Sequence, residues 1–261
     1  MKTFHFLSGL PRSGSTVLAS ILNQNPSVYV TPTSPMLDLL IENQNAWHKL
    51  PSVIANPFPE QLTNITRAMI ESSWQHRPEP IIIDKNRGWG KNMPASTILF
   101  EKEIKMIAMT RDIPSIMASW LALFHKNPNT YMVEKLRNKG REYTDNNIML
   151  EMWFDMVKDC VESLQQAKID AANRILLVNY DELVNNPKTS LLSIESFLNL
   201  PKHEYDFDNI INDTNDDDVS AWGLNGMHSI RTKLNKTAKH PKDILGEELY
   251  NIFIEIGKQY G

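Results

Sequence analysis

The sequence predicts an α/β fold built on buried parallel strands, and three observations lead to this prediction. Short apolar runs recur at residues 3–8, 80–84 and 104–110, with the length and two-sided hydrophobicity of buried parallel strands. Segments with helical spacing of apolar residues, such as residues 148–164, separate or follow these runs. Polar residues come directly after the runs, and open α/β sheets bind ligands at the carboxyl ends of their strands.

The composition narrows the classes of function. The chain has 261 residues and a formal net charge of −4, which gives no electrostatic case for a nucleic-acid partner. Its single cysteine, Cys160, allows no intramolecular disulfide and no cysteine-cluster metal site. No apolar run approaches the roughly 18 residues of a membrane span, and residues 1–8 lack the pattern of a secretory signal. We therefore expect a single domain over residues 1–261, cytoplasmic and without a membrane partner.

The first strand leads into a loop with phosphate-binding character. Gly9 and Gly14 have the spacing of the P-loop, with Ser15 where that motif carries lysine and a helix beginning near Thr16. Arg12 supplies the positive charge instead, and backbone N–H groups and the helix dipole add to it. Such a loop should hold one phosphate-like group rather than a triphosphate. The alternative is an ordinary strand-turn-helix corner with chance glycines.

Residues 27–75 lie between the phosphate-binding loop and the predicted strand at residues 80–84. Residues 27–30 predict a strand, residues 31–35 a loop, and residues 36–41 the start of a helix. Three prolines in residues 49–59 predict a loop, and residues 60–75 predict a helix. These segments carry little chemistry by themselves.

Residues 81–83 are three isoleucines, which predict a buried strand ending in Asp84 and Lys85. The first interpretation is a ligand-binding strand end, because open α/β sheets bind ligands at the carboxyl ends of their strands. The second is a Walker-B strand, whose aspartate binds Mg²⁺ in ATP-using enzymes. A solvated Asp-Lys turn is the third interpretation.

The strand at residues 104–110 ends at Arg111, and Pro114 suits the first turn of the helix that follows. Arg111 offers a planar fork to a phosphate. Ser119, eight positions later, offers a hydroxyl donor near the same place. By itself this pattern is only a weak signal for a phosphate-binding group.

The second half of the chain predicts more helix and one more strand. The polar run at residues 129–145 carries Lys135, Arg137, Lys139 and Arg141. It predicts either a basic face for an anionic acceptor or a solvated helix face. Residues 148–164 predict one long amphipathic helix and residues 174–184 a strand running into a turn. The acidic residues 202–221 predict a surface loop, because they lack the spacing of a calcium loop.

Four blocks of the sequence, in order, resemble the sulfotransferase family. Residues 10–16 resemble its 5′-phosphosulfate loop, in the arginine form nearest the tyrosylprotein and bacterial branch. Residues 84–87, 111–119 and 178–187 resemble the later blocks. The resemblance implies a three-layer, P-loop-like α/β domain with a central parallel sheet of about five strands flanked by helices.

The resemblance also implies chemistry. The donor would be 3′-phosphoadenosine 5′-phosphosulfate (PAPS), and its sulfuryl group would pass in line to a hydroxyl or amine of a small-molecule or peptide acceptor. No metal is expected. Lys85 and Arg12 would neutralise charge on the leaving oxygen, with Arg87 and Trp89 facing the acceptor. The residues implied to contact the donor are Pro11, Arg12, Ser13, Gly14, Ser15, Thr16, Arg111, Ser119, Tyr180, Arg231 and Lys233.

The general base is not apparent from the sequence. No histidine closely follows Lys85, and residues 31–35 contain no carboxylate, although relatives place their base at one of these points. Asp38, Glu42 and Asp84 remain, and Asp84 is nearest to Lys85 in sequence. Two alternatives stay open, which are a P-loop kinase using ATP and Mg²⁺ and a catalytically inactive nucleotide-binding protein.

Overall fold

The structure is a computed structural model that describes residues 2–100, 103–212, 214, 217–235 and 239–260. Within these residues one five-stranded sheet has the spatial order β2-β3-β1-β4-β5, and every neighbouring pair is parallel. The strands are β1 (Thr3–Gly9), β2 (Val28–Thr33), β3 (Ile81–Lys85), β4 (Met106–Thr110) and β5 (Ile175–Asn179). The predicted central parallel sheet of about five strands is confirmed.

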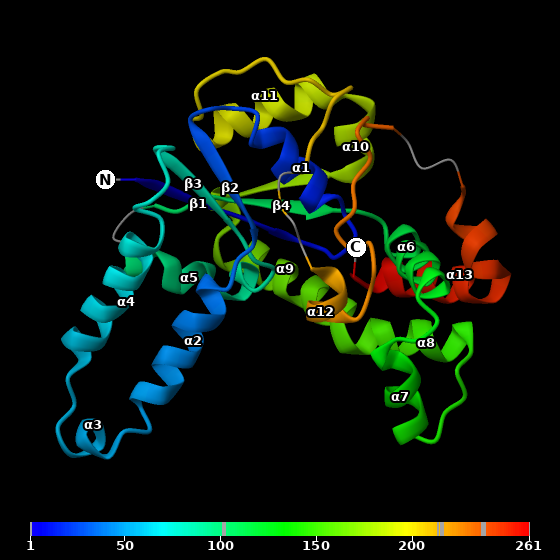
Figure 1. Ribbon diagram of the computed structural model, residues 1–261, viewed down its shortest axis with the longest axis horizontal. Helices are drawn as coiled ribbons and strands as arrows, with labels where there is room; N and C mark the ends of the chain where they lie inside the picture. The colour runs from blue at the N-terminus through cyan, green and yellow to red at the C-terminus, as the bar shows by residue number, and fades with distance from the viewer. Residues whose placement is uncertain (1, 101–102, 213, 215–216, 236–238, 261) are drawn as a thin grey trace.

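Helices cover both faces of the sheet (Figure 1). Successive residues of β1 point to opposite faces, so that Leu7 joins one apolar cluster and Phe6 the other. The cluster around Leu7 includes α1 (Ser15–Leu22), α10 (Tyr180–Asn185) and α11 (Pro187–Leu198). The cluster around Phe6 includes α5 (Trp89–Phe100), α6 (Ile113–Lys126), α8 (Asp145–Met152), α9 (Lys158–Asp170) and α13 (Pro241–Tyr260). The three predicted layers are therefore present.

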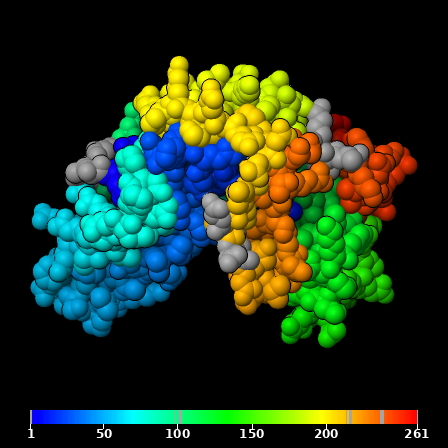
Figure 2. Space-filling view, turned by 45° about the horizontal axis from the view of Figure 1, so that its top comes forward, coloured from blue at the N-terminus to red at the C-terminus, as the bar shows by residue number. Residues whose placement is uncertain are grey.

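Three helices form an arm that extends away from the sheet (Figure 1). They are α2 (Met36–Trp47), α3 (Pro51–Ala55) and α4 (Pro59–Ser73). The prolines of residues 49–59 predicted a loop, but Pro51 and Pro59 each begin a helix. Proline is tolerated at the first position of a helix, because a backbone N–H group there has no hydrogen-bond partner within the helix. Figure 2 shows a hollow between this arm and α12 (Asp218–Trp222) on the other side.

The second strand continues further than the sequence predicts. Residues 31–33 belong to β2, although Pro32 suggested a loop. Proline is tolerated here because β2 is an edge strand of the sheet. The hydroxyl of Thr31 accepts a hydrogen bond from the backbone N–H of Lys85 at 2.8 Å. This contact ties the end of β2 to the end of β3.

The predicted long helix at residues 148–164 is interrupted. A π-helical turn, η1 (Trp153–Val157), separates α8 from α9. Such turns are rare and often lie at functional sites. A short 3₁₀ turn, η2 (Ala172–Arg174), leads into β5, and α7 (Tyr131–Asn138) occupies the polar run before α8.

The predicted fifth strand is shorter than residues 174–184. Helix α10 begins at Tyr180, because Asn179 caps it by accepting hydrogen bonds from the N–H groups of Asp181 and Glu182. In the acidic segment 202–221, α12 forms the last part, and residues 213 and 215–216 lie outside the described residues. In the part of the chain described above, no helix is long and apolar enough to cross a membrane.

Candidate functional site

A cleft of about 1090 Å³ opens at the carboxyl ends of the strands. Residues from the ends of β1, β2 and β3 line it, as does Arg111 directly after β4. The hollow in Figure 2 lies between the arm and α12, both of which contribute lining residues. This is the edge of the sheet where the sequence placed the charged strand ends.

The loop after β1 is fixed by close backbone contacts. Gly9 has a φ of 116°, and a Cβ atom there would lie 2.2 Å from the carbonyl oxygen of Met109. The N–H of Leu10 donates to that oxygen at 2.8 Å. No side chain caps the N-terminus of α1, so its first N–H groups remain available to an anion. The loop therefore has the geometry of a phosphate-binding loop.

The predicted loop residues do not all face the cleft. Arg12, Gly14, Ser15 and Thr16 line it, whereas Pro11 and Ser13 are buried. The hydroxyl of Ser13 donates to the carbonyl oxygen of Leu10 at 2.5 Å and so closes the loop on itself. The side chains of Pro11 and Ser13 therefore shape the loop.

Tyr180 joins the loop to the ends of β4 and β5. Gly14 has a φ of 88°, and a Cβ atom there would lie 2.5 Å from Cδ2 of Tyr180. The guanidinium of Arg111 also packs on the ring of Tyr180, with its Cζ 4.5 Å from the ring centroid. Nη1 of Arg111 donates to the carbonyl oxygen of Arg12 at 3.2 Å. Two arginines a hundred positions apart in the chain thus meet at one end of the cleft.

Arg12 adopts a left-handed backbone conformation with a φ of 59°. Its Nε donates to the hydroxyl of Ser119 at 3.1 Å, and its Nη1 donates to the carbonyl oxygen of Met227. Burial, followed by the charges of Arg87 and Arg111, lowers the pKa of Arg12 to about 10. The guanidinium is still charged at neutral pH, and an anion beside it would offset the repulsion among these cations.

Lys85 and Asp84 point to opposite faces of the sheet, as neighbours in a strand must. Lys85 is buried and lines the cleft. Asp84 is buried and is not among the lining residues, and it accepts a hydrogen bond from the indole N–H of Trp89 at 2.8 Å. Burial raises the pKa of Asp84, and hydrogen bonds from Ser34 and Trp89 oppose that rise. The structure therefore brings Lys85 to the site and leaves Asp84 away from it.

Trp89 also lies away from the cleft, contrary to the expectation that it faces the acceptor. Its ring stacks on Phe6 with centroids 3.7 Å apart and is 1% exposed. The turn after β3 directs Arg87 into the cleft instead.

Asp38 is the carboxylate of the arm that lines the cleft. It lies in the first turn of α2, and its Oδ2 accepts a hydrogen bond from Nδ2 of Asn86 at 3.1 Å. The amide of Asn86 also donates to the carbonyl oxygen of Ser34 at 3.0 Å and accepts from the N–H of Gly88 at 2.9 Å. Asn86 is thus held in one orientation and places Asp38 beside the end of β3.

A buried aspartate-histidine pair was not predicted from the sequence. Asp218 was assigned to an acidic surface loop, but its Oδ1 lies 2.6 Å from Nδ1 of His228, and its Oδ2 accepts from the backbone N–H of His228 at 2.8 Å. His228 lines the cleft directly after Met227, which bonds to Arg12. The pair fixes residues 227–228 against the phosphate-binding loop. A ten-residue separation gives no local signal for such a pair.

Arg231 and Lys233 line the outer part of the cleft and are exposed. The amine of Lys233 lies 3.4 Å from a carboxylate oxygen of Asp208. Arg231 is therefore the better placed of the two for a ligand. Across the described residues, no group of three or more His, Cys, Asp or Glu side chains is arranged to hold a metal ion.

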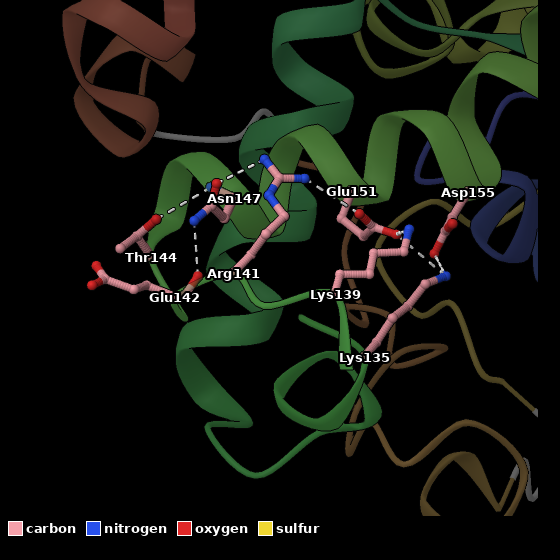
Figure 3. Close-up of polar contacts among 8 residues, drawn as sticks. All are labelled: Lys135, Lys139, Arg141, Glu142, Thr144, Asn147, Glu151 and Asp155. Atoms are coloured by element: carbon pink, nitrogen blue, oxygen red, sulfur yellow. Dashed lines mark hydrogen bonds and ion pairs between the residues drawn. The ribbon is translucent and has the colours of Figure 1, made fainter. Parts of the chain in front are cut away.

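Three of the basic residues in the run 135–141 form ion pairs with carboxylates of α8 and η1 (Figure 3). Glu151, whose side chain is 4% exposed, forms ion pairs with Lys135, Lys139 and Arg141. Lys135 also pairs with Asp155. Hydrogen bonding from Lys139 lowers the pKa of Glu151. This cluster holds α7 to α8 and lies outside the residues that line the cleft.

Comparison with known proteins agrees with this arrangement. The model of the sulfotransferase family matches residues 6–204, which include the loop, Lys85, Arg111, Ser119 and Tyr180. The chain belongs to the sulfotransferase family. The residues of this chain that resemble the family's sequence blocks lie at or near the strand ends described above.

Individual relatives of this chain are distant. Protein-tyrosine sulfotransferase 1 of Danio rerio is 22% identical over 203 residues, which make up 75% of this chain and 53% of that protein. The chain therefore spans about half the length of that relative. The sulfotransferase domain from the curacin biosynthetic pathway has a TM-score of 0.48 and 16% identity, covering 78% of this chain and 76% of that chain. A sulfotransferase from Mycobacterium avium has a TM-score of 0.49 and 15% identity, covering 77% and 64%.

Proposed function

We propose that this protein transfers a sulfuryl group from PAPS to a hydroxyl or amine of a small-molecule or peptide acceptor. The observation that carries the proposal is the meeting of Arg12 and Arg111 at one end of the cleft, with Ser119 bonded to Arg12. Membership of the sulfotransferase family favours this function over the kinase alternative.

A donor phosphorylated at both the 5′ and 3′ positions fits these residues. The N–H groups of the loop and the guanidinium of Arg12 suit the 5′-phosphosulfate, because both favour a single compact anion. Arg111 and Ser119 suit the 3′-phosphate, with Arg231 closing over it from the outer part of the cleft. Tyr180, which contacts Gly14 and Arg111, supplies an aromatic face for the adenine.

The transfer is a single in-line displacement. The acceptor atom attacks sulfur and forms the new bond as the bond between sulfur and the bridging oxygen breaks. The electron pair of that bond leaves with the 5′-phosphate, which gives adenosine 3′,5′-bisphosphate. Lys85 and Arg12 stabilise the negative charge that develops on the leaving oxygen.

We propose that Asp38, rather than Asp84, is the general base that takes the proton from the acceptor. Asp38 lines the cleft and is held by Asn86, the neighbour of Lys85, whereas Asp84 is buried on the other face of β3. An exposed carboxylate can accept a proton from an acceptor that lies over the end of β3. General-base catalysis of this kind contributes roughly 100-fold or more.

Calorimetric titration with adenosine 3′,5′-bisphosphate and, separately, with ATP-Mg²⁺ tests the donor class. We expect tight binding of the bisphosphate and weak binding of ATP-Mg²⁺. The reverse order would contradict the proposal and favour the kinase. Bisphosphate binding without transfer to any hydroxyl or amine acceptor in a PAPS screen would favour the inactive nucleotide-binding protein.

The role of Asp38 is tested with a matched pair of variants on one helix. Glu42 lies one turn further along α2 and is outside the residues lining the cleft, so Glu42→Gln is the control for Asp38→Asn. With an acceptor from the screen, we expect Asp38→Asn to lower kcat by roughly 100-fold while bisphosphate affinity stays unchanged. Equal kcat values for the two variants would exclude Asp38 as the base.

A further inference from the structure

Arg87 is a cation of the cleft to which the proposed donor contacts give no role. Its backbone is fixed because its carbonyl oxygen accepts a hydrogen bond from the hydroxyl of Ser8 at 2.9 Å. Its side chain lines the cleft, and Nη1 donates to the thioether sulfur of Met156 in η1 at 3.5 Å. The guanidinium is therefore held in a defined place near the end of β3.

Among the residues that the structure describes, no carboxylate forms an ion pair with Arg87. Its neighbours are the thioether of Met156, which is a weak acceptor, and the thiol of Cys160. Burial lowers the pKa of Arg87, and burial likewise raises the pKa of the Cys160 thiol, which keeps that neighbour neutral. A partly buried guanidinium with such neighbours favours an anionic ligand.

Arg87 has other bonding partners than the groups that suit the donor's phosphates, although its charge is close enough to lower the pKa of Arg12. Arg12 bonds to Ser119 and Met227, and Arg111 bonds to the backbone of Arg12. Arg87 instead bonds to Met156 of η1, whereas the neighbouring Asn86 bonds to Asp38 of α2. Asp38, Lys85 and Arg87 all line the cleft. An acceptor at the end of β3 would therefore meet both the carboxylate of Asp38 and the guanidinium of Arg87.

We propose that Arg87 binds an anionic group of the acceptor, namely a carboxylate, phosphate or sulfate. This inference rests on the proposed sulfuryl transfer and makes the acceptor an anion that also carries the accepting hydroxyl or amine. The planar fork of arginine gives such a group two hydrogen bonds. Arg87 then selects charged acceptors and orients the accepting atom toward Asp38.

The test measures binding of inorganic sulfate to preformed complexes by calorimetry at constant ionic strength. One complex contains saturating adenosine 3′,5′-bisphosphate and the other contains saturating PAPS, whose integrity is checked by chromatography. We expect the wild-type chain to bind sulfate in both complexes. Arg87→Met should weaken that binding at least roughly tenfold, and Arg87→Lys should weaken it less, because the charge is kept.

Arg137→Met is the matched control, because Arg137 is exposed on α7, outside the cleft lining, and its loss changes the net charge equally. It should leave sulfate binding unchanged. Sulfate binding to the bisphosphate complex alone would assign Arg87 to the donor's sulfuryl group and overturn the proposal. Equal sulfate affinity in Arg87→Met and wild type would also overturn it. Loss of bisphosphate binding in Arg87→Met would make Arg87 a donor contact, whereas failure of the wild type to bind bisphosphate would refute the proposed function itself.

Discussion

The two walls of the cleft are built in different ways. On the donor side, the loop at residues 9–16 is packed against Met109 and Tyr180 so closely that Gly9 and Gly14 have no room for a side chain. On the other side, the arm exposes large apolar residues that do not line the cleft, with Ile54 68% and Phe58 50% exposed. Close packing therefore holds the loop in one conformation, whereas these side chains of the arm are largely exposed to solvent.

The largest effect that we expect concerns β1, the strand that carries the donor loop. Burial, followed by the charge of Lys105, lowers the pKa of His5 from 6.5 to about 4. Above pH 6.5 the ring is neutral in both states. Between pH 6.5 and 4, His5 binds a proton in the unfolded chain but not in the folded chain. The free energy of unfolding therefore falls by about 3 kcal/mol over this window.

Urea unfolding of wild type and His5→Leu at pH 7.5 and pH 4.5 measures this effect. The variant should lose less stability than wild type between the two pH values. Parallel losses in the two proteins would show that His5 does not titrate in this window.

The next effect tests how tightly the donor side is packed. Gly14→Ala places a Cβ atom 2.5 Å from Tyr180 at a φ of 88°. We expect a loss of about 2 kcal/mol in the free energy of unfolding, from the left-handed backbone and the clash together. Tyr180→Ala should restore part of this loss in the double variant, because it removes the clashing ring. A Gly14→Ala variant as stable as wild type would contradict the packing argument.

A smaller effect tests the phosphate contact itself. Arg111→Ala removes a charge-assisted contact and the group that packs on Tyr180. It should weaken binding of adenosine 3′,5′-bisphosphate at least roughly tenfold, or about 1.4 kcal/mol. Arg137→Ala, on the exposed face of α7, is the control in the same titration. Unchanged affinity in Arg111→Ala would remove the 3′-phosphate assignment.

The smallest effect is expected in the arm. Ile54→Ser changes an exposed side chain in α3, so the free energy of unfolding should stay within about 0.5 kcal/mol of wild type. Bisphosphate affinity should also be unchanged. A large loss of stability would show that the arm is packed as firmly as the donor side and would remove the contrast drawn above.

The sequence by itself determined the parallel sheet, the glycine loop after β1 that carries Arg12, and the position of Arg111 directly after β4. It could do so because these features depend on local rules. A buried strand is a short apolar run, a phosphate-binding loop needs glycines at fixed spacing, and the carboxyl ends of parallel strands meet at one edge.

Tertiary structure alone decided that Asp38 lines the cleft and Asp84 does not. Sequence distance favoured Asp84 because it adjoins Lys85, but neighbours in a strand point to opposite faces, and Asp84 is buried against Trp89. Asp38 reaches the cleft because it lies in the first turn of α2, where Asn86 at the end of β3 bonds to it. The pairing of Asp218 with His228 likewise depends on how a loop packs. Such contacts join residues far apart in the chain, and no local pattern of residue types specifies them.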